Sequence, residues 1–90
     1  MEFGLALHAA KNGKKIFRAG WRDGGIFAVY QRGYPDGIPC NHQTAEAWGM
    51  QEGEPFKCNP YLQIKNENGT HSMWTPSVDE ILADDWEIMD

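Results

Sequence analysis

The sequence predicts an α+β fold, in which one N-terminal helix packs on a twisted, mainly antiparallel sheet. An apolar pattern with helical spacing near the N-terminus predicts the helix. Several short runs of β-branched and aromatic residues, separated by glycine, proline and asparagine, predict the strands. The 90 residues are the length of a single domain, residues 1–90. Because a chain this short buries a limited core, we also expect it to oligomerise.

The first helix is predicted over residues 3–11. Its apolar side chains recur at helical spacing, at Phe3, Ala6, Leu7 and Ala10. Gly13 follows the end of this pattern and can take the left-handed conformation that terminates a helix. His8 lies off the apolar stripe, so we expect a surface histidine with no metal-binding role.

Two strands are predicted next, over residues 14–19 and 26–32, with a hairpin connection between them. The connection is residues 20–25, which contain three glycines and Trp21. Glycines allow positive φ angles, and successive backbone N–H groups in such a loop can form an anion-binding nest. The alternative is a tight turn whose tryptophan packs on the core.

Residues 33–60 are predicted to leave the sheet in a long excursion, because glycine and proline recur throughout them. Within the excursion, residues 44–48 are predicted to form a short helix, with Asn41 as its N-cap and Gly49 as its stop. A connection of this length in a small protein commonly serves function or assembly.

The C-terminal third is predicted to add a hairpin, a capped helical turn and a last strand. Residues 61–65 and 70–74 alternate as strands, and Asn68-Gly69 between them favours a type I′ turn. Ser77 and Glu80 have the spacing of a capping box. The helical turn that follows has one apolar face, formed by Val78, Ile81 and Leu82. The closing strand starts at Trp86, which we expect to lie in the core.

The net charge of −5 argues against a general nucleic-acid binder. The acidic residues gather at the C-terminus. Residues 1–78 contain eight basic and seven acidic residues, a net charge of +1. An anionic ligand can therefore bind the N-terminal part if Arg18 and Arg22 converge there.

The sequence predicts neither an enzyme nor a metal site. The only cysteines are Cys40 and Cys58, and without a signal peptide we expect them to be reduced in the cytoplasm. With His42 and His71 they match no zinc spacing. No nucleophile motif is present, no cofactor fingerprint appears, and no apolar run is long enough to span a membrane.

Three of the four tryptophans stand beside turns, which favours a stacking role. They are Trp21, Trp48 and Trp74. Aromatic faces stack nucleobases at about 1–3 kcal/mol per base, and arginines or backbone amides can bind phosphates. This combination suits a small cyclic or linear nucleotide. The alternative is a core whose tryptophans reach its edge.

The order and spacing of short motifs over nearly the whole chain resemble one family of small phage and prophage proteins. It includes the second-described class of Thoeris anti-defence proteins, the nucleotide sponges. The motifs that carry the resemblance are Phe3-Gly4-Leu5-Ala6-Leu7, Lys11-Asn12-Gly13-Lys14, Arg18-Ala19-Gly20-Trp21, Gly33-Tyr34-Pro35-Asp36-Gly37-Ile38-Pro39-Cys40-Asn41, Thr44-Ala45, Pro60-Tyr61-Leu62, Asn68-Gly69, Trp74-Thr75-Pro76-Ser77 and Leu82-Ala83-Asp84-Asp85-Trp86-Glu87.

The resemblance implies a protein that binds cyclic nucleotide immune signals in the host cytoplasm without cleaving them. The family's ligands include glycocyclic ADP-ribose isomers and, in some members, cyclic dinucleotides at separate sites. Members form homotetramers with pockets between subunits. Carried onto this sequence, the resemblance and the residue types together give these candidate ligand-binding residues: Trp21, Trp74, Arg18, Arg22, Asn41, Thr44, Ser77 and Asp79.

Two other functions remain open from the residues. A surface rich in exposed tryptophan also suits a direct protein-binding inhibitor of a host defence effector. A hydrolase of the same signals is a third alternative, which the absence of a nucleophile or metal set disfavours.

Overall fold

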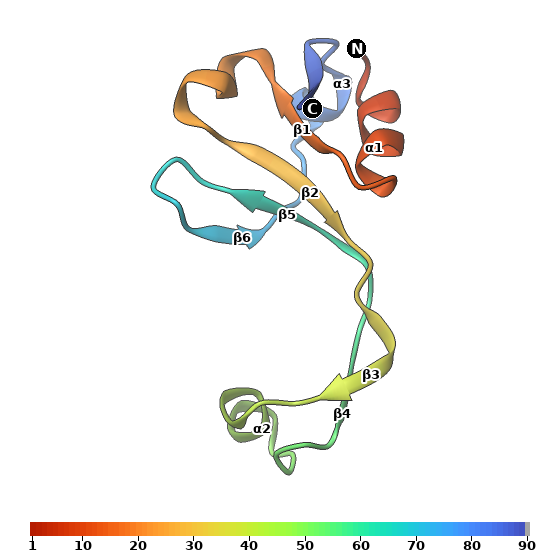
Figure 1. Ribbon diagram of the computed structural model, residues 1–90, viewed down its shortest axis with the longest axis vertical. Coiled ribbons are helices and arrows are strands. Elements are labelled where there is room, and N and C mark those ends of the chain that lie inside the picture. Colours follow the sequence, from red (N-terminus) through yellow and green to blue (C-terminus); the bar gives the residue numbers. More distant parts are fainter. Residues whose placement is uncertain (90) are drawn as a thin grey trace.

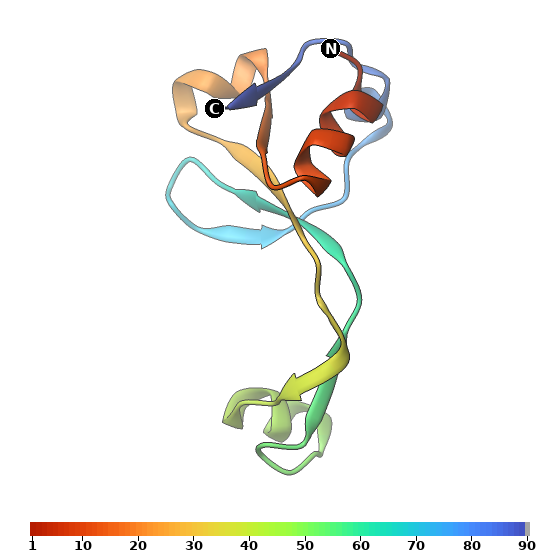
Figure 2. The same cartoon turned by 45° about the vertical axis from the view of Figure 1, so that its right-hand side comes forward.

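A computed structural model describes residues 1–89 and shows a body from which a long arm projects (Figure 1). Its extents are 45 × 26 × 26 Å. The body contains helix α1, a five-stranded antiparallel sheet and helix α3, which confirms the predicted α+β class. We call residues 33–60 the arm. It contains helix α2 and a separate two-stranded sheet, and Figure 2 shows it extending away from the body as well.

The strand order in the body is β6-β5-β2-β1-β7. All four neighbouring pairs are antiparallel, with β1 next to both β2 and β7, and β5 next to both β2 and β6. The elements of the body are α1 (Phe3–Lys11), β1 (Lys15–Arg18), the 3₁₀ helix η1 (Ala19–Gly24), β2 (Phe27–Gln31), β5 (Tyr61–Lys65), β6 (His71–Met73), α3 (Val78–Leu82) and β7 (Trp86–Met89).

Helix α1 covers one face of this sheet, as its apolar stripe predicts. Ala6 and Ala10 are fully buried against Ile16 of β1 and Ala28 of β2. Their small side chains let the helix approach the strands closely. Gly13 has a φ of 94° just after the helix, which confirms its predicted role as the stop.

The glycine-rich connection between β1 and β2 is a hairpin link, as predicted, but its backbone is a 3₁₀ helix. The N–H of Gly25 donates to the carbonyl of Arg22 at 3.1 Å, and the N–H of Ile26 donates to that of Trp21 at 3.3 Å. These two amides are therefore used inside the loop. They are not available to an anion, whereas the proposed anion-binding nest as a whole stays a prediction.

The predicted hairpin of β5 and β6 is confirmed, whereas its predicted turn type is wrong. A type I′ turn needs positive φ at both central residues. Within residues 1–89 only glycines have positive φ. At this turn Gly69 is the residue with positive φ, at 87°, and Asn68 is not. The N–H of Gly69 donates to the carbonyl of Asn66 at 3.0 Å. The turn is therefore a longer one that closes through a left-handed glycine.

The capping box at the start of α3 is confirmed in both directions. The N–H of Glu80 donates to Ser77 Oγ at 3.1 Å, and the N–H of Ser77 donates to Glu80 Oε1 at 2.8 Å. The apolar face of this short helix does not enter the core, however. The exposed fractions are 70% for Val78 and 77% for Leu82. The core under the helix is filled by Trp86 instead.

The arm contains β3 (Tyr34–Pro39), α2 (His42–Trp48) and β4 (Pro55–Cys58). Helix α2 confirms the predicted short helix, because Asn41 Oδ1 accepts from the N–H of Thr44 at 2.8 Å and Gly49 has a φ of 70°. The antiparallel pair of β3 and β4 was not predicted. Three prolines lie in its strands and remove ladder donors, which hides the strand pattern.

Gly33 sits where the chain leaves the body for the arm. Its φ is 68°, and a Cβ placed there would lie 2.4 Å from the backbone carbonyl oxygen of Cys58. The outgoing and returning chains therefore cross at a distance that only glycine permits. The pairing of β2 with β5 at Gln31 and Tyr61 resumes beyond this point as the pairing of β3 with β4 at Tyr34 and Cys58.

We predict that Gly33→Ala lowers the free energy of unfolding by about 2 kcal/mol or more, because it combines a left-handed residue with a backbone clash. Urea denaturation measures this change. Gly20→Ala is the matched control: Gly20 lies at ordinary φ, and a Cβ added there would have no atom within 4 Å, so we expect a change within about 0.5 kcal/mol. Equal effects of the two substitutions would contradict the role given to the crossing.

Candidate functional site

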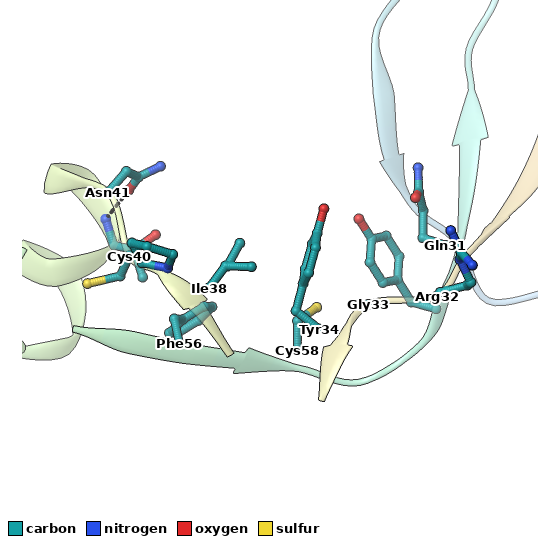
Figure 3. A pocket seen from close by; sticks show the side chains of 12 residues that line it. Gln31, Arg32, Gly33, Tyr34, Ile38, Cys40, Asn41, Phe56 and Cys58 are labelled. Atoms are coloured by element: carbon teal, nitrogen blue, oxygen red, sulfur yellow. Dashed lines mark hydrogen bonds between the residues drawn. The ribbon is translucent and has the colours of Figure 1, made fainter. Parts of the chain in front are cut away.

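A hollow of about 480 Å³ lies where the arm joins the body, and we call it the arm-base hollow. It is formed by the end of β2, the two arm strands, the start of α2 and the start of β5 (Figure 3). The size is within the range of small-molecule sites. Its lining residues are Gln31, Arg32, Gly33, Tyr34, Ile38, Pro39, Cys40, Asn41, Thr44, Phe56, Cys58 and Tyr61.

The lining of the arm-base hollow contains one charged residue, Arg32, and no carboxylate. The chain as a whole, by contrast, carries a net charge of −5. Among residues 1–89 Arg32 forms no ion pair, whereas Arg18 and Arg22 each do. An anionic group bound beside Arg32 therefore meets a cation without a competing protein carboxylate.

Three aromatic rings contribute to the apolar lining of the hollow. Figure 3 shows the ring of Tyr34 rising between Ile38 on the arm side and Gly33 on the body side. Tyr34 is 54% exposed. Phe56 and Tyr61 also line the hollow. Exposed ring faces beside a cation are the surfaces that a nucleotide uses, with its base on a ring and its phosphate on the arginine.

Two of the predicted ligand-binding residues, Asn41 and Thr44, lie in this hollow. Both are fixed by the N-terminus of α2, where Asn41 Oδ1 accepts the N–H of Thr44. With that oxygen engaged, the Asn41 side-chain amide keeps its two N–H donors available. At the body end, Gln31 Nε2 donates to Gln63 Oε1 at 3.0 Å, which holds the Gln31 side chain in place.

The predicted stacking residues Trp21 and Trp74 lie in the body, in an aromatic cluster around Trp86. Their ring centroids are 5.8 Å apart at an interplanar angle of 78°. Both rings also contact Trp86, at 5.3 and 6.0 Å between centroids. Each is half-buried and packs against the core. Part of their surface is therefore used in edge-to-face packing, and their stacking on a base stays a prediction.

Arg18, a predicted phosphate ligand, is paired with Asp85. Its Nε donates to Asp85 Oδ1 at 2.8 Å and its second terminal nitrogen donates to Oδ2 at 3.3 Å. The hydrogen bond to Asp85 raises the pKa of Arg18, with smaller contributions from the charges of Glu80 and Asp79. The same hydrogen bond holds the pKa of Asp85 below its usual value. Two of the five guanidinium N–H donors are used in this pair, so a phosphate bound to the other donors would lie beside the negative charge of Asp85.

Arg22 also contacts a carboxylate. It donates to Glu87 Oε1 at 2.7 Å and lies over the ring of Phe17, at 5.2 Å from its centroid. Both partners of the ion pair are largely open to solvent, with side-chain exposures of 64% for Arg22 and 40% for Glu87. A pair this exposed is weakened by salt and contributes little to stability.

The last two predicted residues belong to the start of α3. The hydroxyl of Ser77 is occupied by the capping box, and Asp79 is exposed in the first turn of the helix. Their neighbourhood is acidic, with Asp79 and Glu80 in that turn. The structure therefore divides the eight predicted residues into two groups, with Asn41 and Thr44 in the arm-base hollow and the other six in the body.

Sequence reasoning missed Arg32, Tyr34 and Tyr61. The criterion applied to the tryptophans, an aromatic residue beside a turn, also fits Tyr34, which stands between Gly33 and Pro35. Arg32 shows no such pattern. It reaches the hollow only because the chain crosses itself at the next residue.

Residues 1–89 contain neither a metal-ligand cluster nor a helix suited to a bilayer. No three side chains among their His, Cys, Asp and Glu residues come together as metal ligands would. None of the helices has the length and apolar character needed to cross a membrane.

Comparison with known proteins gives two matches along almost the whole chain. Residues 1–89 match the model of a family described as the Thoeris anti-defense 2-like domain. The chain is also 29% identical over 93 residues to a protein of Bacillus phage SP01 named Thoeris anti-defense 2, with 99% of this chain and 94% of that protein covered. The matched region includes both the body and the arm.

The Arg18–Asp85 pair makes a testable contribution to acid stability. Because the pKa of Asp85 is lower in the folded protein than in the unfolded chain, the pair stabilises the fold above the ordinary aspartate pKa. This contribution is lost as the pH falls through the folded-state pKa of Asp85. We therefore predict that the stability of Asp85→Asn falls less on acidification than that of the unmodified protein. The midpoint of thermal unfolding, measured between about pH 2 and pH 7, gives this acid limb of the stability curve.

Asp84→Asn is the matched control, because the neighbouring Asp84 side chain is exposed and forms no ion pair within residues 1–89. We expect it to keep the acid limb of the unmodified protein. An acid limb for Asp85→Asn identical to that of the unmodified protein would show that the pair contributes nothing.

Proposed function

Since the chain belongs to the Thoeris anti-defense 2-like family, we propose that it sequesters a cyclic nucleotide immune signal without cleaving it. The family membership supports an anti-defence role. The proposed ligands are glycocyclic ADP-ribose isomers, with cyclic dinucleotides as a further class. Because sequestration works by binding alone, affinity and slow release determine its effect and no catalytic group is needed.

The arm-base hollow is the observation that best supports this proposal. It offers an exposed ring at Tyr34, a half-buried ring at Tyr61, a cation at Arg32 and amide donors at Asn41. A nucleotide has the complementary groups, namely a flat base, phosphates and polar base edges. The lining brings no carboxylate that would repel a phosphate.

Assembly is part of the proposal. The hollow lies on the surface between arm and body, where Figure 3 shows its labelled side chains spread along one side of the ribbon. A site that encloses a nucleotide needs a second wall, since buried ligands lose most of their contact with water. We propose that another copy supplies this wall in a homotetramer.

Isothermal titration with a panel of glycocyclic ADP-ribose isomers and cyclic dinucleotides tests the proposal. We expect at least one of them to bind with a dissociation constant of about 1 μM or lower, equivalent to about −8 kcal/mol. The bound ligand should be recovered unchanged after the protein is denatured. If no member of the panel binds at micromolar concentration, sequestration is excluded for these ligands.

We predict that Tyr34→Ala weakens ligand binding roughly tenfold or more, which corresponds to the loss of one stacked ring. Met73→Ala removes a similarly exposed apolar side chain, which is 72% exposed on β6, outside the hollow. We expect this control to bind as the unmodified protein does. Circular dichroism establishes that both variants remain folded.

Arg32→Gln should weaken binding and also flatten its salt dependence, because the lost contact is ionic. Lys57→Gln removes one positive charge from the same arm outside the lining, so it controls for net charge. If the ligand stacks on the aromatic cluster of the body instead, Trp21→Phe lowers the affinity and both hollow variants leave it unchanged.

The rival function is direct inhibition of a host defence protein, and Trp48, which is 69% exposed at the end of the arm, favours it. Ligand recovery separates the two functions. A sequestering protein incubated with the nucleotide releases intact nucleotide when denatured. A protein-binding inhibitor captures none, and a hydrolase returns degraded nucleotide.

A further inference from the structure

We propose that the tip of the arm binds a basic hollow at the end of α1 in a second copy of the chain, and that two copies exchange arms in this way. The arm tip is the region around Trp48 with the carboxylates of Glu46 and Glu52. The basic hollow, of about 350 Å³, is lined by Ala10, Lys11, Asn12, Gly13, Tyr30 and Arg32.

The arm buries few apolar side chains. Its only buried apolar residues are Cys40 and Ala45. Trp48 packs edge-on against Phe56, at 4.9 Å between ring centroids, yet remains 69% exposed. A two-stranded sheet is marginal in water unless another element covers it. The exposed tryptophan is available to a second surface, and large aromatic anchors of this kind dominate protein interfaces.

Opposite charges are separated between the arm and the first part of the body. Residues 33–60 contain four acidic residues and one basic residue, a net charge of −3, whereas residues 1–32 contain two acidic and six basic residues, a net charge of +4. Within residues 1–89, Arg18 and Arg22 are paired with carboxylates, but Lys11, Lys14 and Arg32 form no ion pair. The carboxylates of Glu46 and Glu52 meet only His42, at 3.5 Å each.

A chain cannot satisfy these charges by itself. Figures 1 and 2 both show α2 at the far end of the long axis, away from the body that holds α1. The basic hollow lies in the body, at the C-terminal end of α1. A second copy brings an acidic arm tip to this hollow and offers its own hollow in return. Such a reciprocal contact is a closed two-fold interface, the commonest form of protein oligomer.

Charge reversal on each side tests the pairing without any ligand. Glu46→Lys with Glu52→Lys makes the arm tip positive, and Lys11→Glu with Lys14→Glu makes the end of α1 negative. Each double variant alone sets like charges against each other at both contacts, so we expect its self-association to weaken roughly tenfold or more. Sedimentation velocity over a range of concentrations measures the change.

An equimolar mixture of the two double variants is the decisive sample. The positive arm of one variant meets the negative hollow of the other, and the remaining arm and hollow keep their natural charges. We expect the mixture to associate as tightly as the unmodified protein. A mixture that remains as weak as its components would overturn the proposed pairing.

Glu67→Lys with Asp84→Lys is the matched control. It changes the net charge by the same amount as reversal of the arm tip, at exposed positions of the body outside the basic hollow. We expect it to associate normally. If self-association of this control weakens as much as that of the arm variant, the effect comes from net charge and the specific contact is overturned.

The unmodified protein gives a test that does not depend on whether variants fold. Raising the salt concentration from about 0.05 M to about 0.5 M should raise its dissociation constant, because salt screens the proposed ion pairs. Trp48→Ala should weaken association further at both concentrations. Association that neither salt nor Trp48→Ala changes would exclude the arm tip. Since no nucleotide is present, these results are separate from those that test sequestration.

Discussion

The packing around Trp86 is the constraint on which the body depends. Its ring is 1% exposed, and its indole N–H donates to the carbonyl of Glu80 at 2.9 Å. A buried indole needs such an acceptor, because an unpaired N–H in the core costs more than the hydrogen bond contributes. The rings of Phe3, Trp21 and Trp74 pack on it from α1, η1 and the segment before α3. One side chain from the last strand thereby connects elements distant in the sequence, and α3 is positioned by its backbone rather than by its apolar face.

The arm differs from the body, since it is built on paired strands that continue the β2–β5 ladder and has few buried apolar residues. The close approach of Gly33 to Cys58 leads the chain away from the sheet, and the arm-base hollow is the space left between arm and body. This placement puts Arg32 between two hollows that both lack carboxylates. In a chain with a net charge of −5, the fold thus keeps its acidic residues away from the surfaces proposed for a phosphate and for a second arm.

The tryptophans show how far residue type alone can assign a site. Their positions beside turns favoured stacking on a ligand, yet Trp21 packs edge-to-face with both Trp74 and Trp86, and Trp74 also packs on Trp86 at a tilt. The local sequence is the same for a tryptophan that faces a ligand at a turn and for one at the edge of a core. What the ring contacts depends on residues distant in the sequence, because the ring is large. Likewise, Arg18 and Arg22 find Asp85 and Glu87 through pairing of β1 with β7, which no local pattern reveals.

Local sequence by itself determined α1, the N-cap of α2 by Asn41, the capping box at Ser77 and the hairpin of β5 and β6, since each depends on residues within a few positions of one another. It also located the excursion at residues 33–60. Only the tertiary structure decided that this excursion carries its own sheet and that Arg32 and Tyr34 share a hollow with Asn41 and Thr44. The physical reason is that a site between body and arm is formed by backbone segments distant in the sequence, and their close approach at Gly33 is a long-range contact that no local pattern shows.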